Sequence, residues 1–269
     1  MKRSERIGAI IKIMSDNPER SFTLRYFADL LGVSKSTASE DVQGAKRAVA
    51  GCDLGRIVTT PGATGGVRYV PYISDSRVRE IQEELCEKLR DPSRMTGGGF
   101  LYTSDIMFSY EMTRKMGLVL ARKYAQAKPD YIVTLETKGI PLAMQVSGLM
   151  NTPLTVIRRE TKVSEGATVS INYYSTASGL MQKMSMAKRA IKPGSRALLI
   201  DDFMRGGGSL KGVYELLREF DVEVCGIGVA IGSTNYREQK VEGAVSIVLL
   251  REVDESSQFI DVIPNSRIF

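Results

Sequence analysis

The chain has 269 residues, no His and no Trp, and 37 basic against 31 acidic side chains give it a net charge of +6. The lack of His excludes catalytic relays built on imidazole, as well as metal sites that need imidazole ligands. Three widely spaced cysteines without a CxxC pair argue against structural zinc and a disulfide framework. The apolar runs are far shorter than the roughly 18 residues of a membrane span. We therefore expect a cytoplasmic protein without membrane contact.

The first quarter of the chain predicts a helix-turn-helix. Residues 1–74 hold eleven basic and seven acidic side chains, so +4 of the net charge lies there. Apolar side chains recur at helical spacing over residues 4–15, and a second short helix begins at about Thr23. The turn 32–34 then leads to a third helix with Ser34 as its N-cap. Two helices around a short turn with Gly are typical of DNA-binding domains.

A β-hairpin is predicted directly after these helices. Strands at 55–60 and 67–70 are separated by a turn rich in Gly, which is the arrangement of a wing beside a helix-turn-helix. The alternative is a helical hairpin with a solvated polar face, followed by a plain β-hairpin. Small polar residues, lysine, arginine and close backbone approach suit contacts to bases and phosphates. The positions that we expect at double-stranded operator DNA are Lys35, Ser36, Thr37, Ser39, Arg56, Thr60, Gly62 and Arg68.

Residues 74–92 predict a charged amphipathic helix that serves either as a connector or as a dimer contact. We place the domain boundary there, with a DNA-binding domain at 1–73 and a second domain at 74–269. Beyond residue 110, apolar strands alternate with helices, which predicts an α/β fold with a parallel sheet covered on both faces. The predicted strands are 131–135, 154–157, 197–200, 224–231 and 245–250, and the predicted helices are 112–126, 141–150 and 210–220.

Residues 197–209 are the most specific stretch of the chain. A buried strand leads to Asp201 and Asp202, and a glycine-rich turn then opens a helix. Ligands of open α/β sheets bind at the carboxyl ends of strands, and the amides of a Gly turn at a helix N-terminus bind anions. Acids suit hydroxyl donors or a hydrated Mg²⁺. The pattern predicts a sugar-phosphate site, although a generic strand, turn and helix share its outline.

This stretch resembles the signature of the type I phosphoribosyltransferase family. The resemblance implies that the two acids face the ribose hydroxyls of phosphoribosyl pyrophosphate and that the turn holds its 5-phosphate. It also implies that the loop after strand 131–135 contacts the pyrophosphate. The basic stretch after residue 157 would be a mobile loop, for which a solvated β-hairpin is the alternative. With Tyr102 expected in the same cleft, the effector-binding residues are Asp201, Asp202, Phe203, Met204, Arg205, Gly206, Gly207, Gly208, Ser209, Thr137, Lys138, Gly139, Arg158, Lys162 and Tyr102.

A second resemblance rests on the wing 60–67, the stretches 162–166 and 170–173, and the segment with the acid pair. Over nearly its whole length, the chain resembles the pur operon repressors of Gram-positive bacteria. The resemblance implies a homodimer that binds operator DNA of purine biosynthesis and transport genes. Phosphoribosyl pyrophosphate, with Mg²⁺ carried by the ligand, would act as inducer without catalysis. A guanine-nucleotide alarmone is expected to fit the same sugar-phosphate site.

Two alternatives stay open at this point. One is an active purine phosphoribosyltransferase fused to a DNA-binding domain, and the other is a second domain that serves only for dimerisation. The final stretch, residues 260–269, leaves little room for a separate base-binding element, and we identify none that would hold a nucleobase. Three successive glycines also stand in the phosphate turn where transferases usually carry Thr. The first feature favours a binding domain over an enzyme, and the second makes the phosphate turn more flexible.

Overall fold

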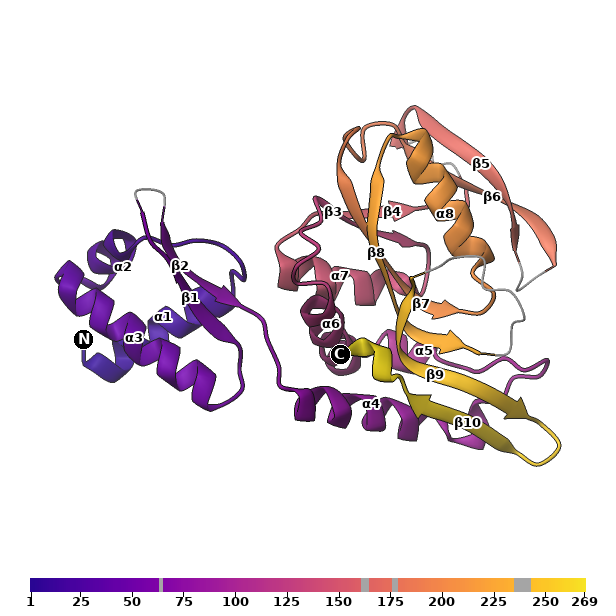
Figure 1. The fold of residues 1–269 in the computed structure, drawn as a ribbon, viewed down its shortest axis with the longest axis horizontal. Coiled ribbons are helices and arrows are strands. Elements are labelled where there is room, and N and C mark those ends of the chain that lie inside the picture. The colour runs from indigo at the N-terminus through magenta and orange to yellow at the C-terminus, as the bar shows by residue number, and fades with distance from the viewer. Residues whose placement is uncertain (63–64, 161–164, 176–178, 235–242) are drawn as a thin grey trace. The chain divides into compact units, whose positions relative to one another are not determined.

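The computed structural model describes residues 1–62, 65–160, 165–175, 179–234 and 243–269 (Figure 1). It divides into two compact units, one of Met1–Ser74 with Gly148–Asn151 and the other of Asp75–Ser147 with Thr152–Phe269. Within these described ranges, no helix is long and apolar enough to cross a membrane.

The first unit has the predicted helices and hairpin. Its elements are α1 (Arg3–Ser15), α2 (Leu24–Leu31), α3 (Lys35–Gly51), β1 (Arg56–Thr60) and β2 (Gly66–Val70), with β1 and β2 antiparallel. The side chain of Thr23 caps α2, and that of Ser34 caps α3 by accepting from the N–H of Thr37 at 3.1 Å. These caps satisfy amides that the first turn of each helix leaves unpaired, which explains why the helices begin at these residues. The apolar faces meet in one core around Ile10, Phe27 and Val42.

The second unit is built on a six-stranded, mostly parallel sheet. Its strand order is β10-β9-β8-β7-β3-β4, and only the pair of β9 and β10 is antiparallel. A separate hairpin consists of β5 and β6. The strands are β3 (Tyr131–Leu135), β4 (Leu154–Ile157), β5 (Thr168–Ser175), β6 (Leu180–Ala187), β7 (Arg196–Met204), β8 (Glu223–Ser233), β9 (Val245–Asp254) and β10 (Phe259–Pro264). The helices are α4 (Asp75–Leu89), α5 (Ser104–Met107), α6 (Tyr110–Lys123), α7 (Gly139–Met150) and α8 (Gly208–Glu219), with short 3-10 turns at Pro92–Arg94 and Ser266–Ile268.

Helices cover both faces of this sheet. Strand β8 shows this, since its successive side chains point to opposite faces. Ile227 and Val229 join the core beneath α8. Gly226 and Gly228 lie against Tyr124 at the end of α6, which leaves no room for a Cβ at either glycine. Tyr124 donates to the carbonyl oxygen of Ile227 at 2.5 Å, so its hydroxyl is satisfied inside the core.

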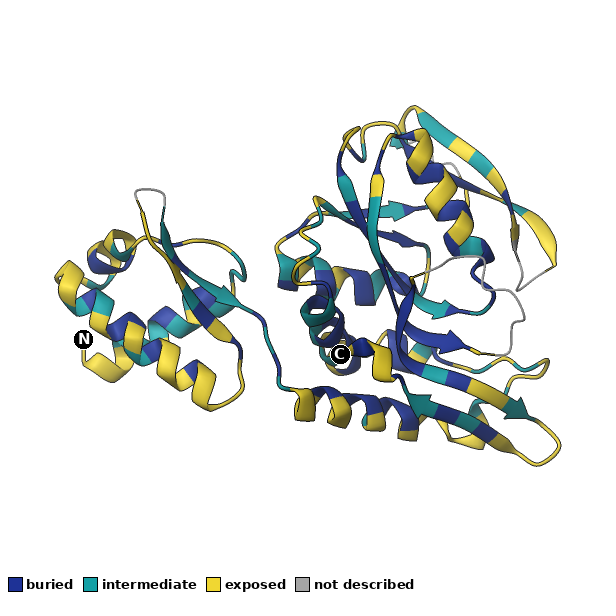
Figure 2. Cartoon of the chain, in the orientation of Figure 1, coloured by how far each residue is buried: buried dark blue, intermediate teal, exposed yellow. Residues whose placement is uncertain are grey.

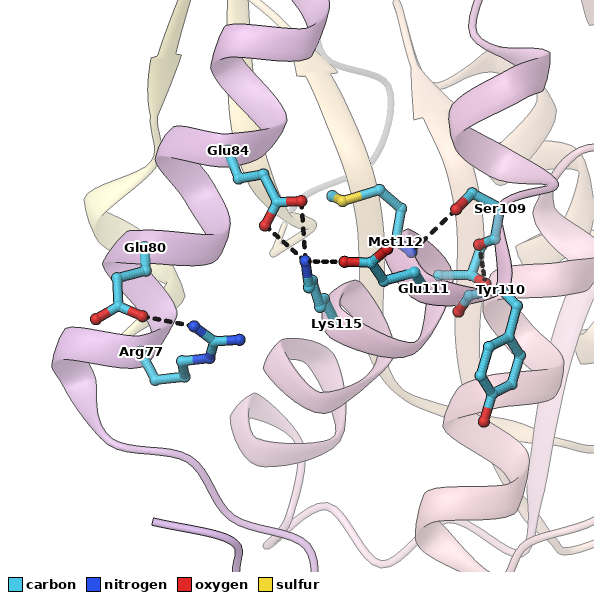
Figure 3. A network of polar contacts seen from close by, with 9 residues as sticks. Arg77, Glu80, Glu84, Ser109, Tyr110, Glu111, Met112 and Lys115 are labelled. Atoms are coloured by element: carbon cyan, nitrogen blue, oxygen red, sulfur yellow. Dashed lines mark hydrogen bonds and ion pairs between the residues drawn. The ribbon is translucent and has the colours of Figure 1, made fainter. Parts of the chain in front are cut away.

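The predicted connecting helix is part of the second unit. Figure 2 shows a buried face along α4, and the buried side chain of Gln82 on that face donates to the carbonyl oxygens of Ile247 and Asn265 at 2.7 and 3.0 Å. Figure 3 shows Lys115 of α6 between Glu84 of α4, at 2.8 Å, and Glu111, at 2.6 Å. Hydrogen bonds to Glu111 and Glu84 raise the pKa of Lys115. These contacts fix α4 against α6 and the sheet.

The prediction of a short central strand was incomplete. The apolar run ends at Ile200, yet β7 continues to Met204 and carries the two acids within it. The neighbouring β8 explains this extension, since Val229 pairs with Asp201 and Gly232 with Met204. The hairpin β5–β6 and the antiparallel strand β10 were not among the predicted strands, although a hairpin had been the alternative for the stretch after residue 157.

Candidate functional site

The two acids lie at the carboxyl end of β7, where Asp201 is 8% exposed. Its Oδ1 accepts from the N–H of Asp202 at 3.0 Å. Burial, followed by the charge of Asp202, raises the pKa of Asp201 well above its ordinary value, and burial likewise raises the pKa of Asp202. The positive charge of Lys138 acts in the opposite direction and lowers the pKa of Asp202. The pair is therefore a desolvated group of hydrogen-bond acceptors at the end of the strand.

A cavity of about 420 Å³ opens beside this pair. It brings together most of the predicted residues from two separate segments, which are Thr137, Lys138, Asp201, Asp202, Phe203, Met204, Arg205, Gly207, Gly208 and Ser209. Seven further lining residues were not predicted: Phe100, Leu101, Thr103, Leu135, Glu136, Arg159 and Leu210.

The glycine-rich turn forms an anion cradle at the start of α8. Gly207 is the N-cap residue with a φ of 73°, a left-handed conformation that favours glycine. No side chain caps this helix, all of which lies in the described part of the chain, so its first amides remain available to a ligand. Ser209 adds a hydroxyl at the cavity wall, whereas the buried Gly206 does not line it.

Arg205 lines the cavity, and its guanidinium packs against two aromatic rings. The guanidinium carbon lies 3.5 Å from the centroid of the Phe100 ring and 5.6 Å from that of Phe203. Its Nη2 donates to the carbonyl oxygen of Gly99 at 2.8 Å. Stacking on aromatic faces and this hydrogen bond hold the charge of Arg205 beside Phe100 at the cavity wall.

The loop between β3 and α7 packs directly on the acid pair. Thr137 and Lys138 line the cavity, and the peptide bond between Glu136 and Thr137 is cis. Gly139 lies behind them: a Cβ there would meet Oδ1 of Asp201 and would lie 2.6 Å from Oγ1 of Thr134. Glycine at this position lets the loop approach the strand that carries the acids.

The basic stretch after β4 contributes Arg159 rather than Arg158. Arg158 pairs with Glu136 at 3.4 Å and with Glu165 at 3.1 Å, and it lines a separate cavity of about 280 Å³. Because neighbouring side chains at a strand end point to opposite sides, Arg159 faces the main cavity. Lys162, the other predicted contact, lies outside the described residues.

The segment before α5 supplies a wall that sequence reasoning missed. Met95 and Leu101 form an isolated β-bridge, and Arg94 pairs with Asp105 at 2.8 Å, which closes the loop at its base. Phe100, Leu101 and Thr103 line the cavity from this loop, whereas the predicted Tyr102 is half exposed and does not. The signal for this wall in the sequence was the run Gly97–Gly99, which directly precedes the aromatic residues Phe100 and Tyr102.

The predicted DNA-contact residues belong to α3 and to the β1–β2 hairpin of the first unit. Lys35 and Ser36 are exposed at the start of α3, while Thr37 and Ser39 are half-buried. The hydroxyl of Ser34 lies 2.8 Å from that of Ser36 and 2.9 Å from that of Thr37, so both belong to the cap of the helix. Lys35 is thus the cation at this end of α3.

The wing residues have partners within the chain. The guanidinium carbon of Arg56 lies 3.4 Å from the centroid of the Tyr72 ring. Arg68 pairs with Glu19 at 3.0 Å, and burial raises the pKa of that glutamate. Thr60 and Gly62 are exposed at the end of β1. Both arginines lie on the hairpin face opposite the buried Ile57 and Val67, as the strand alternation requires.

Comparison with known families agrees with both units. Residues 2–71 match the family described as bacterial purine repressor, N-terminal, and residues 113–262 match the phosphoribosyl transferase domain. The second match includes the strand with the acid pair and the phosphate turn. The chain therefore joins the N-terminal domain of a bacterial repressor to a domain of the phosphoribosyltransferase fold.

Relatives extend this similarity over nearly the full length. The chain is 37% identical to a probable purine biosynthesis transcriptional regulator PurR of Streptococcus pneumoniae, over 97% of this chain and 96% of that protein. It is 35% identical to the purine biosynthesis transcriptional activator PurR of Lactococcus lactis (97% of each) and to the repressor PurR of Bacillus subtilis (97% and 92%). The chain belongs to the PurR family of bacterial purine regulators.

A solved structure confirms the fold of the second unit. Adenine phosphoribosyltransferase from Rhodothermus marinus superposes with a TM-score of 0.55 at 20% identity, over 64% of this chain and 99% of that one. At this identity the similarity concerns the fold alone.

Proposed function

We propose that this protein is a cytoplasmic, homodimeric repressor of purine biosynthesis and transport genes, released from operator DNA by phosphoribosyl pyrophosphate. The observation that carries the proposal is the single cavity that joins the buried acid pair, the open amides of α8 and the Thr137–Lys138 loop. The first unit supplies the surface for DNA, with a capped α3 and an exposed Lys35.

Each part of the ligand has a matching group in the cavity. Asp201 and Asp202 accept hydrogen bonds from the ribose hydroxyls, and the amides of α8 with Ser209 hold the 5-phosphate. Lys138 and Arg159 offer cations to the pyrophosphate. A guanine-nucleotide alarmone carries the same ribose and pyrophosphate groups, so it would occupy the same cradle and compete with the inducer.

Magnesium fits this site as an ion that is bound together with the ligand. In the described part of the chain, no three His, Cys, Asp or Glu side chains gather as a metal site. Mg²⁺ keeps several waters and takes one or two carboxylates beside substrate phosphates, a set that the acid pair with pyrophosphate can complete. The ion would neutralise charge on the ligand.

We propose that the second unit binds its ligand without catalysis. The wall formed by Phe100, Leu101 and Thr103 is the observation that favours the other candidate, an active transferase, because such a wall can face a nucleobase. A product assay with purine bases, phosphoribosyl pyrophosphate and Mg²⁺ separates the two. No nucleotide formation is expected, and robust formation would establish the enzyme.

A DNA-binding titration at fixed, stated salt tests the central proposal. Operator DNA is bound in the absence of phosphoribosyl pyrophosphate, and the apparent affinity is expected to fall as the ligand is added with Mg²⁺. Reciprocity requires DNA to weaken ligand binding by the same factor, which calorimetry of the DNA complex can check. Unchanged DNA affinity at saturating ligand would contradict the proposal.

Lys35→Ala is expected to weaken DNA binding about equally for operator and non-operator sequences, because a lysine at this position neutralises a phosphate. The slope of log affinity against log salt should become shallower by about one per protomer. Lys46→Ala, on α3 about 16 Å further along the helix, is the matched control with little expected change. An unchanged salt slope for Lys35→Ala would remove Lys35 from the interface.

A further inference from the structure

The guanidinium of Arg159 is held in place at the cavity wall. Its Nη1 donates to Oε1 of Gln182 at 2.7 Å, and the backbone N–H of Arg159 donates to Oε1 of Glu136 at 2.6 Å. Both the main chain and the end of the side chain are therefore fixed. Gln182 comes from β6, more than twenty residues away in sequence and outside the cavity lining described above.

Gln182 is itself anchored to the core of the second unit. Tyr173 is its partner across the β5–β6 hairpin, and the Tyr173 hydroxyl donates to the same Oε1 at 2.7 Å. Only 4% of Tyr173 is exposed, and its ring packs with Met184 against Gly212 of α8. Because arginine has donors only, the oxygen of the Gln182 amide must face it, and two donors then use both lone pairs.

The main chain keeps the two partners in register. Residue 158 and Ser185 form an antiparallel bridge, with N–H to O distances of 2.9 and 2.8 Å in the two directions. Ser185 lies three residues after Gln182 on β6, and Arg159 directly follows the other end of the bridge. The hydrogen bond between Arg159 and Gln182 therefore joins two segments that the backbone already holds together.

We propose that Gln182 is a positioning residue that orders the Arg159 guanidinium for the anionic part of the ligand. An arginine that is already ordered loses less side-chain freedom on binding, so its contact to a phosphate contributes more to affinity. Gln182 acts only through Arg159 and does not touch the ligand. The inference rests on the proposed function, because it concerns affinity for phosphoribosyl pyrophosphate.

A double-mutant cycle tests the inference on the full chain. Calorimetry measures the Kd for phosphoribosyl pyrophosphate with Mg²⁺ in the wild type, Gln182→Met, Arg159→Met and the double variant. We expect Gln182→Met to weaken binding about fivefold and Arg159→Met about tenfold or more, and the double variant to bind no worse than Arg159→Met alone. Asn172→Ala, an exposed site on the same hairpin, is the control and should leave Kd unchanged.

Tyr173→Phe provides a second variant that keeps the ring in the core. It is expected to weaken binding about twofold when Gln182 is present and not at all in Gln182→Met. Additive losses in the cycle, or an unchanged Kd in Gln182→Met, would overturn the positioning role. A wild type that binds no phosphoribosyl pyrophosphate would instead overturn the proposed function, so the two failures are distinguishable.

Discussion

Asp201→Asn is expected to weaken binding of phosphoribosyl pyrophosphate about 10- to 100-fold, the range for loss of a charged hydrogen-bond acceptor. Affinity for operator DNA in the absence of ligand should stay at the wild-type value, because the first unit is untouched. At ligand concentrations that release the wild type, the variant should remain bound. Parallel calorimetry and DNA titration measure both effects, and release of the variant at wild-type ligand concentrations would contradict the assigned role.

The same substitution is expected to stabilise the second unit. Folding raises the pKa of Asp201, so its ionised carboxylate disfavours the folded state. This penalty is absent below the ordinary pKa of 3.8 and develops as the pH rises through the folded value. Thermal unfolding at neutral pH should therefore show a higher Tm for the variant, by about 2–4 °C for each 1 kcal/mol removed, and the difference should vanish in acid.

Asp254→Asn is the matched control, with the opposite sign. Asp254 accepts from the hydroxyls of Ser256 and Ser257, both at 2.6 Å, and these hydrogen bonds lower its pKa. Its ionised form thus favours the folded state, and that contribution is present at neutral pH. The control should lower Tm and leave ligand affinity unchanged. A lower Tm for both variants would show that burial does not penalise Asp201.

Gly139→Ala is expected to disrupt the cavity by overpacking. The added Cβ would contact the Asp201 carboxylate and Thr134, which are both buried, so the loop and the acid strand must separate. Overpacking of this kind costs about 1–3 kcal/mol, and ligand affinity should fall by at least tenfold since the loop and the acids share one ligand. Chemical denaturation and calorimetry measure the two effects.

Gly148→Ala lies on the same helix and serves as the control. A Cβ there meets nothing within 4 Å, so the substitution should be neutral or stabilise α7 by up to about 1 kcal/mol through helix propensity. Ligand affinity should not change. Wild-type affinity in Gly139→Ala would mean that the loop does not pack on Asp201 as described.

The local patterns of the chain were predictable from sequence because each depends on neighbours along the chain. Ser34 as a cap, the strand before Asp201 and the turn at Gly207 all follow from short-range rules. The continuation of β7 beyond Asp201 was not predictable, since it depends on pairing with β8.

Pocket walls assembled from distant segments were harder to predict. Phe100 lines the cavity, and its ring lies against Arg205 more than a hundred residues later. The choice between Arg158 and Arg159 depends on where the end of β4 points relative to the cavity, a fact of tertiary geometry. A basic run indicates that a cation is available, whereas the fold decides which one faces the ligand.

The chain is packed into one unit or the other up to the junction at residues 74 and 75. Ile73 is 5% exposed, and the N–H of Ser74 donates to Asp53 at 3.0 Å, so the polypeptide is folded onto the first unit up to this point. The next residue, Asp75, already begins α4 and pairs with Arg122 of the second unit. The chain therefore passes from one compact unit to the other within the backbone of residues 74 and 75.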